Sequence, residues 1–253
     1  MTSNTGLNIQ RFDILDSTST EALRCARSGA AHGTVLVARS QTGGRGRDGR
    51  KFHSPPGGLY FSIIIRPALG AEIFPLITLA AGAAVHRVLG EITGLDSVKL
   101  KWPNDIFVRD AKVAGLLTET GPVQQSGVPE YVVCGVGVNL NTRLQDFPAD
   151  VSATVDSLSR CTGVCYNDHQ VLVQLAEAIV EAVDNLERDR NRILAHWRKA
   201  DYLLDRPLQC SVDGKVIQAV GAGLADDGRY MVRDRANILY HVLAGDLKPL
   251  RIC

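Results

Sequence analysis

The chain has 253 residues, of which 45% are hydrophobic and 22% charged, and its formal net charge is +1 at pH 7. This length and apolar content predict one sizeable core with a small second domain attached. The near-neutral charge argues against a general nucleic-acid or membrane binder, because those partners usually require a broad cationic surface. Electrostatic interactions important for function should therefore be local.

The N-terminal stretch MTSNTGLNIQRF lacks the cationic start and apolar core of a signal peptide. No segment approaches ~18 uninterrupted apolar residues, so we expect a cytoplasmic protein with no membrane partner. The six cysteines include no CxxC pair and no His at zinc spacing, which predicts free thiols and assigns no residue to a metal.

The first predicted elements are a strand over residues 9–15 and a helix that starts at Ser17 or Thr18. Thr18 and Glu21 have the spacing of a capping box, and Gly29 should end the helix. A long packing helix is predicted over residues 74–93, and short apolar runs predict strands over residues 33–38, 59–66, 98–102, 105–109, 112–119 and 130–139. Without a clean βαβ succession, this order predicts an α+β fold with a mixed β-sheet flanked by helices.

The pattern changes twice in the C-terminal third. Residues 168–199 have helical periodicity. After Arg206, short β-type runs alternate with Asp-Gly turns at 213–214 and 227–228, which favours a small antiparallel barrel. We place the domain boundary near residue 204, with domains over 1–203 and 204–253.

The segment QTGGRGRDGRK at 41–51 carries four glycines and four cations in eleven residues. It approaches a P-loop through Gly44 and Gly49, but Arg50 and Lys51 replace the required Lys and Ser/Thr, and a strand follows instead of a helix. A solvated loop and an RGR-type nucleic-acid contact are alternatives. Arginine forks and glycine amides favour a phosphate ligand.

A second informative segment is KLKWPND at residues 99–105, where a strand breaks at a proline. The break presents the amide of Asn104 and the carboxylate of Asp105 at a sheet edge. Lys112 follows seven residues later. Taken singly, these residues are more typical of turn chemistry and of an exposed lysine than of a functional site.

Taken together, six segments resemble the biotin protein ligases in order and spacing. They are DST at 16–18, QTGGRGRDGR at 41–50, SPPGGLYFS at 54–62, KWPND at 101–105, KVAGLLTE at 112–119 and GVGVNLN at 135–141. The resemblance covers nearly the whole chain. It implies a class II synthetase-like catalytic domain of the biotin/lipoate ligase type and a C-terminal SH3-like β-barrel.

The resemblance also implies an activity. Biotin and ATP, with Mg²⁺, would give biotinyl-5′-AMP, and a lysine of a biotin carboxyl carrier protein or domain, as in acetyl-CoA carboxylase, would then take the biotin. Lys112 would bridge carboxylate and α-phosphate, Arg47 would lie along both, and Asp105 would steer or deprotonate the incoming amine. The implied biotin contacts are Ser17, Thr18, Ser19, Gln41, Arg45, Gly46, Arg47, Lys112 and Gly115, and the implied ATP or adenylate contacts are Arg47, Arg50, Phe52, Asn104, Lys112 and Asn139.

Two residues depart from the family pattern. Ser19 stands where Asn is usual, which weakens a ring contact, and Phe52 stands where Trp is usual, which removes an indole N–H but keeps the aromatic body. Rival hypotheses are a lipoate or octanoate ligase and a biotin-binding protein without transfer activity. With fifteen residues before DST, we expect no winged-helix domain and no DNA binding; a homodimer is left open.

Overall fold

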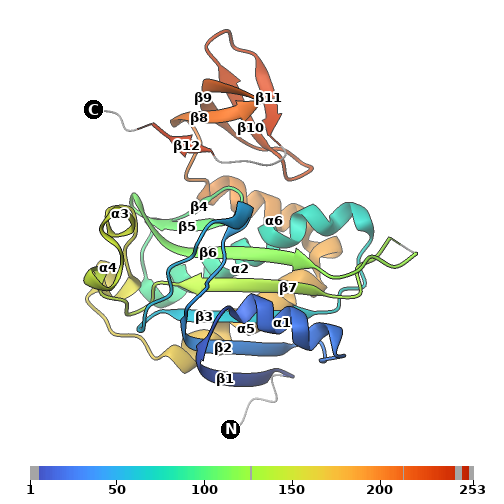
Figure 1. Cartoon of the computed structure of the whole chain (residues 1–253). Helices are drawn as coiled ribbons and strands as arrows, with labels where there is room; N and C mark the ends of the chain where they lie inside the picture. The colour runs from blue at the N-terminus through green and yellow to red at the C-terminus, as the bar shows by residue number, and fades with distance from the viewer. Residues whose placement is uncertain (1–5, 126, 213, 243–246, 251–253) are drawn as a thin grey trace.

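The computed structural model describes residues 6–125, 127–212, 214–242 and 247–250, and these form two β-sheets with helices (Figure 1). The larger sheet has the order β1-β2-β3-β7-β6-β5-β4. Its strands are β1 (Asn8–Leu15), β2 (Thr34–Gln41), β3 (Leu59–Ile65), β4 (Val98–Lys101), β5 (Asp105–Val108), β6 (Ala111–Thr120) and β7 (Val132–Val138). Only β1 and β2 pair in parallel within this sheet, so the predicted mixed sheet is confirmed.

Helices cover both faces of this sheet (Figure 1). The longer ones are α1 (Thr18–Arg27), α2 (Phe74–Thr93), α5 (Asp168–Asp184) and α6 (Leu186–Ala200); α3 (Ala149–Ser152), α4 (Leu158–Thr162) and the 3₁₀ turns η1 (Arg47–Gly49), η2 (Ala71–Ile73) and η3 (Leu144–Asp146) are short. Side chains of β2 alternate between the faces: Val35 and Val37 pack into the large core under α2 and α5, whereas Leu36 packs against α1.

Helix α2 is apolar enough, with a mean hydropathy of 1.3, to satisfy the length and composition of a membrane span. In the fold, 61% of that window is buried, and α5 and α6 pack on it. A fully buried Leu or Ile contributes about 1.5–3 kcal/mol to stability, so α2 is a central core helix.

The start of α1 differs from the predicted capping box. Ser17 is the N-cap, and its Oγ accepts from the Thr20 amide. Thr18 lies inside the helix and its amide donates to Gln41, while Glu21 pairs with Arg24. The helical run of 168–199 also divides into two helices at Asn185.

The second sheet is antiparallel, with the order β11-β10-β9-β8-β12. Its strands are β8 (Pro207–Val212), β9 (Lys215–Leu224), β10 (Tyr230–Asp234), β11 (Leu239–Val242) and β12 (Lys248–Pro249). The predicted turn at 227–228 lies between β9 and β10, where Gly228 has φ 85°; Asp213 of the other turn lies outside the described residues. The boundary predicted near residue 204 falls between α6 and β8. The two-domain division and the SH3-like assignment stay predictions.

The two sheets are in direct contact. Trp102 Nε1 donates to the Gly228 carbonyl at 3.1 Å, and Tyr230 Oη donates to Asp201 Oδ2 at 2.8 Å. Buried residues of both sheets belong to one continuous core. The turn of the small sheet therefore lies directly on the KWPND segment.

Candidate active site

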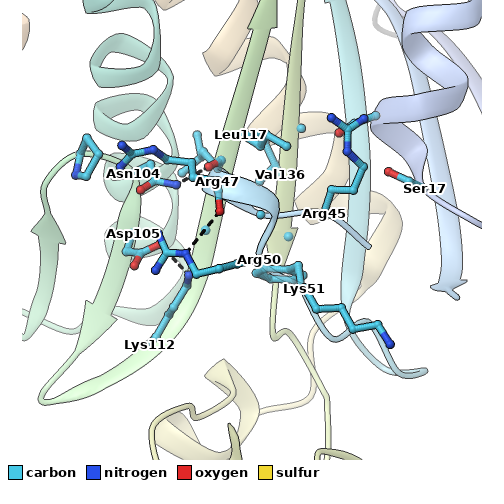
Figure 2. A pocket seen from close by; sticks show the side chains of 18 of the residues that line it. Ser17, Arg45, Arg47, Arg50, Lys51, Asn104, Asp105, Lys112, Leu117 and Val136 are labelled. Atoms are coloured by element: carbon cyan, nitrogen blue, oxygen red, sulfur yellow. Dashed lines mark hydrogen bonds and ion pairs between the residues drawn. The ribbon is translucent and has the colours of Figure 1, made fainter. Parts of the chain in front are cut away.

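A cavity of about 200 Å³ opens where the β2–β3 connection, the start of α1, the β4–β5 turn and strands β6 and β7 meet (Figure 2). The predicted site residues that line it are Ser17, Thr18, Ser19, Gln41, Arg45, Gly46, Arg47, Arg50, Phe52, Asn104, Asp105, Lys112 and Gly115. Asn139 does not line it. The fold thus brings together five segments that are distant in sequence.

One end of the cavity is built from a directed chain of hydrogen bonds. Thr18 Oγ1 and the Thr18 amide both reach Gln41 Oε1, at 3.1 and 2.8 Å. This fixes the Gln41 amide so that Nε2 donates to Ser54 Oγ at 2.7 Å. Behind Thr18, the Ser62 hydroxyl donates to Thr18 Oγ1 and pairs with Ser19 Oγ at 3.1 Å. The network is pre-oriented for a ligand with polar ring edges.

The Ser19 hydroxyl is used within this network. It is buried, and with Ser62 donating to Thr18, Ser19 donates to Ser62. Sequence reasoning did not single out Ser54 and Ser62, although both lie in the matched segment at 54–62. The alternation of side chains along the predicted strand could have indicated that Ser62 points toward this network. Ser54 lies outside that strand, so no such signal applied to it.

Glycines of β7 provide room for the floor of the cavity. A Cβ at Gly137 would lie 2.4 Å from the Phe52 ring, and one at Gly135 would lie 2.4 Å from Ser19 Oγ. Any side chain at these positions would displace them. Phe52 also packs edge-on against Tyr60, with ring centroids 6.3 Å apart, so it serves here as an apolar wall.

Lys112 and Asp105 form an ion pair in the lining of the cavity. Lys112 Nζ lies 2.6 Å from Asp105 Oδ1, and the two side chains are 28% and 19% exposed. The ammonium also lies 5.6 Å from the centre of the Phe52 ring, a cation–π arrangement. This ammonium is a compact positive charge held by groups on two sides.

The KWPND turn places the Asn104 side chain beside this pair. Asn104 Nδ2 donates to the Leu116 carbonyl at 2.5 Å, and the Leu116 amide donates to the Asn104 carbonyl at 2.9 Å. The Trp102–Pro103 peptide is cis. These bonds fix the turn to β6, and Lys101 and Trp102, which sequence reasoning had not proposed as contacts, also line the cavity.

The glycine-arginine loop has a defined backbone in the structure. The Gly46 amide donates to the Arg50 carbonyl at 2.7 Å, the Phe52 amide donates to Gly44 at 2.9 Å, and Asp48 has φ 55°. Figure 2 shows Arg47 and Arg50 on the side of Asn104 and Asp105, while Arg45 lies toward Ser17. The loop therefore distributes its arginines over both ends of the cavity.

Asn139 is the one predicted adenylate contact that does not line the cavity, and its contact with adenylate stays a prediction. It is buried, and its Nδ2 donates to the Asp156 carbonyl at 3.1 Å and to the Lys112 carbonyl at 3.4 Å. It directly follows β7, and these bonds tie it to the start of β6 and to the segment around Asp156. Its contact is with the backbone of Lys112.

The charges of the lining favour an anionic ligand. Six cationic side chains line the cavity, namely Arg45, Arg47, Arg50, Lys51, Lys101 and Lys112, against the single lining carboxylate of Asp105 among the described residues. The lining provides electrostatic stabilisation and positioning, which suits transfer of phosphoryl or acyl groups.

The fold and the cavity define the class: an α+β protein whose mixed sheet carries a cation-lined site with a hydroxyl and amide network at one end. The model of the Biotin/lipoate A/B protein ligase family matches residues 12–139, about half of the chain. The chain belongs to this family.

Similar proteins and structures support this assignment to the family. The chain is 30% identical to the bifunctional ligase/repressor BirA of Salmonella typhimurium over 229 residues, which is 89% of the chain and 69% of the relative. It is 37% identical to BirA of Bacillus subtilis over 159 residues, 62% of the chain and 48% of the relative, so it spans about half the length of that protein. The structure of biotin protein ligase from Aquifex aeolicus in complex with biotin and ATP superposes with a TM-score of 0.80 and 26% identity, covering 97% of this chain and 99% of that chain.

Proposed function

We propose that the protein is an ATP-dependent biotin protein ligase that makes biotinyl-5′-AMP and transfers biotin to a lysine of a carrier protein or domain. The observation that carries the proposal is the joining, in one cavity, of the Thr18–Gln41–Ser54 network and the Lys112–Asp105 pair with Arg47. The names of the relatives support it: a ligase/repressor, and the biotin–[acetyl-CoA-carboxylase] ligase of Mycobacterium tuberculosis, 26% identical over 93% of this chain.

In the first step, a biotin carboxylate oxygen forms a bond to the α-phosphorus of ATP, and the bond to the β-phosphate oxygen breaks to release pyrophosphate. Two anions must approach each other, so the site must neutralise charge and align the reactants. Lys112 would face both groups as a point charge, and the Arg47 guanidinium would hold phosphate oxygens in a fork.

In the second step, the amine of the acceptor lysine attacks the biotinyl carbonyl, forming the amide C–N bond while the C–O bond to AMP breaks. The amine must lose a proton, and Asp105 is a carboxylate at the cavity that can take it. The first step uses Mg²⁺ in this proposal. Mg²⁺ is usually held by one or two carboxylates together with phosphates and water. The described residues contain no cluster of His, Cys, Asp or Glu that could hold a metal ion, so the ion would enter on the phosphates of ATP.

The test is to incubate the pure protein with ATP, Mg²⁺, a biotin carboxyl carrier domain and either biotin or lipoate, and to measure the carrier mass. We expect a gain equal to biotin minus water, with no gain for a carrier whose acceptor lysine is changed to Arg. A gain with lipoate alone would make the protein a lipoate ligase, and biotin binding without any gain would make it a binding protein. A cytoplasmic location and the lack of DNA binding stay predictions.

A further inference from the structure

Arg45 has different partners from the other cations of the glycine-arginine loop. Its Nη2 forms an ion pair with Glu119 Oε1, and its Nη1 donates to Thr20 Oγ1 at 3.4 Å. Glu119 lies near the end of β6, and Thr20 lies in the first turn of α1. Figure 2 shows Arg45 lying apart from Arg47 and Arg50. Strand β6 and helix α1 thus each contribute one side chain that contacts Arg45.

The charge of the Glu119 carboxylate is stabilised mainly by its contact with Arg45. Its side chain is 22% exposed, and among the described residues its Oε2 is buried with no hydrogen-bond partner. A partly buried carboxylate with one orphan oxygen is stabilised chiefly by its counter-ion. Arg45 is the cation that the structure pairs with it.

The position of Arg45 at the base of the loop means that its pair with Glu119 affects the rest of the loop. Arg45 and Lys51 form a β-bridge, and the Gly46 amide bonds to the Arg50 carbonyl, so Arg45 is one side of the base of the turn. The turn beyond it carries Arg47 and Arg50 toward Asp105. Fixing Arg45 therefore fixes the base from which these two arginines extend.

We propose that Glu119 is a positioning residue that anchors the glycine-arginine loop through Arg45, so that the loop has a fixed base and a movable tip. Part of the guanidinium of Arg45 is thereby occupied by protein groups, and the charge that meets the phosphates comes from the tip. The effect on adenylate rests on the proposed function, but the anchoring does not.

The anchoring is tested by amide hydrogen exchange of the ligand-free, full-length protein, followed by mass spectrometry. Glu119→Gln keeps the size and an acceptor but removes the charge. We expect exchange within residues 43–51 to become about three- to tenfold faster, as for loss of a partly buried charge-assisted hydrogen bond, while Tm stays near that of wild type. Glu91→Gln, which breaks the exposed pair with Arg87 on α2, is the matched control and should change nothing in the loop.

Two further variants decide between anchoring and a general loss of structure. Thr20→Val removes the second contact of Arg45 at an exposed helix position, and it should speed exchange in the same residues to a smaller extent. Arg45→Gln should match Glu119→Gln, and the double variant should show no further increase, because both changes break one interaction. Unchanged loop exchange in Glu119→Gln and Thr20→Val, or fully additive effects in the double variant, would overturn the proposal.

A kinetic measurement links the anchor to the reaction. Glu119→Gln should raise KM for ATP several-fold, because Arg47 and Arg50 then extend from a base that is no longer fixed, while kcat for adenylation stays within about twofold, since Lys112 and Asp105 are unchanged. A fall in kcat at unchanged KM would contradict a positioning role. If the wild-type protein fails to activate biotin, only the proposed function falls, because the exchange experiment needs no substrate.

Discussion

At the scale of single residues, Lys112 is held both through its ammonium and through its backbone. Its ammonium is fixed by Asp105 and lies over the Phe52 ring. Its carbonyl accepts from the Asp156 amide and from Asn139, and its amide donates to the Thr154 carbonyl. A charge that is positioned before the substrate arrives needs little reorganisation during the reaction, which is the condition for effective electrostatic catalysis.

Lys112→Ala should therefore reduce adenylate formation by roughly two to four orders of magnitude while leaving the fold intact. The measurement is pyrophosphate release, with circular dichroism as a check on folding. Lys199→Ala, at an exposed position of α6, is the control and should react at the wild-type rate. Unchanged pyrophosphate release in Lys112→Ala would refute the role.

Asn139→Leu tests the structural role of the buried amide. The change removes the donor to the Lys112 and Asp156 carbonyls, so we expect a loss of about 1–3 kcal/mol in the free energy of unfolding, the usual cost of buried polar groups left without partners. Urea denaturation measures it. Adenylate formation should also slow, because Lys112 loses backbone support. A variant of normal stability but with weakened ATP binding would instead indicate a direct contact with the nucleotide.

At the scale of elements, the β2–β3 connection combines a pinned base with a charged tip. Its four cations repel one another and four glycines soften its backbone, while Asp48 and Glu119 offset part of the charge. From the sequence, we expect residues 42–56 to be mobile without ligand and to order over biotinyl-AMP, excluding water from the mixed anhydride. This stays a prediction; the anchor confines the motion to the tip.

Arg47→Gly should loosen that tip, so that adenylate still forms but escapes and acylates lysines of unrelated proteins. The variant is mixed with ATP, biotin and a lysine-rich bystander protein, and biotin on the bystander is detected by blotting. Arg235→Gly, in an exposed turn of the small sheet, is the control. The lid role is wrong if Arg47→Gly makes adenylate at a measurable rate yet labels the bystander no more than wild type does.

A second element, β4, is tied to the helices by two histidines. His86 Nε2 lies 3.0 Å from the Val98 carbonyl, and His86 Nδ1 lies 2.9 Å from His196 Nε2. Burial lowers the pKa of His86 to about 4, with His196 and Lys99 adding to the decrease, and burial with Arg87 and Lys199 lowers the pKa of His196. Both rings are therefore neutral at pH 7.

These shifts predict that the protein loses stability in mild acid. An unfolded histidine has a pKa near ~6.5, so between that pH and about 4 the unfolded chain binds more protons than the folded one. The contribution of His86 is fully present above the unfolded pKa and is lost as the pH falls through the folded value, which amounts to about 3 kcal/mol. Urea denaturation from pH 7.5 to 4.5 measures it. His86→Leu should flatten this slope, whereas His241→Gln, at an exposed position of β11, should not.

At the scale of the whole molecule, the small sheet is part of the support of the active site. Its turn holds Trp102 through the Gly228 carbonyl, Tyr230 bonds to Asp201, and Arg198 pairs with Asp226 across the same contact. Burial is the main cause that raises the pKa of Asp201. The contact between the two sheets is thus an extension of the main core. Its loss should change the position of the KWPND segment.

Truncation after Asp205 should accordingly impair both stability and biotin transfer, and Tyr230→Phe is the milder test. Losing the hydroxyl deprives the Asp201 carboxylate of a donor, which should cost about 1–2 kcal/mol in the free energy of unfolding. Tyr240→Phe, in β11 of the same sheet, is the control for a hydroxyl outside this contact. A truncated protein that is folded and fully active in both steps would show that the second sheet is dispensable.

The larger elements were predictable because their signals are local. The helix over 74–93 was predicted with its observed bounds, and the strand at 59–66 differs from β3 by one residue. Errors occurred where a tertiary contact competes with a local rule. Ser17, one of the two predicted starts of the first helix, is its N-cap, but the predicted capping box does not form, because Thr18 bonds to Gln41 and Glu21 pairs with Arg24. The break at Asn185 was missed because apolar periodicity continues through it.

The sequence by itself determined which chemical groups the site contains, namely glycine amides, arginines, Lys112 and Asp105. These groups occur in short segments, and each segment can be recognised from its own residues without knowledge of the fold. Tertiary structure decided which of these groups face one another. Arg45 meets Glu119 across 74 residues, and Trp102 meets Gly228 across 126. The direction of a side chain such as Asn139 depends on how two strands pack, which residue type and spacing do not specify. Partners brought together by burial in a common core are fixed only by the folded chain.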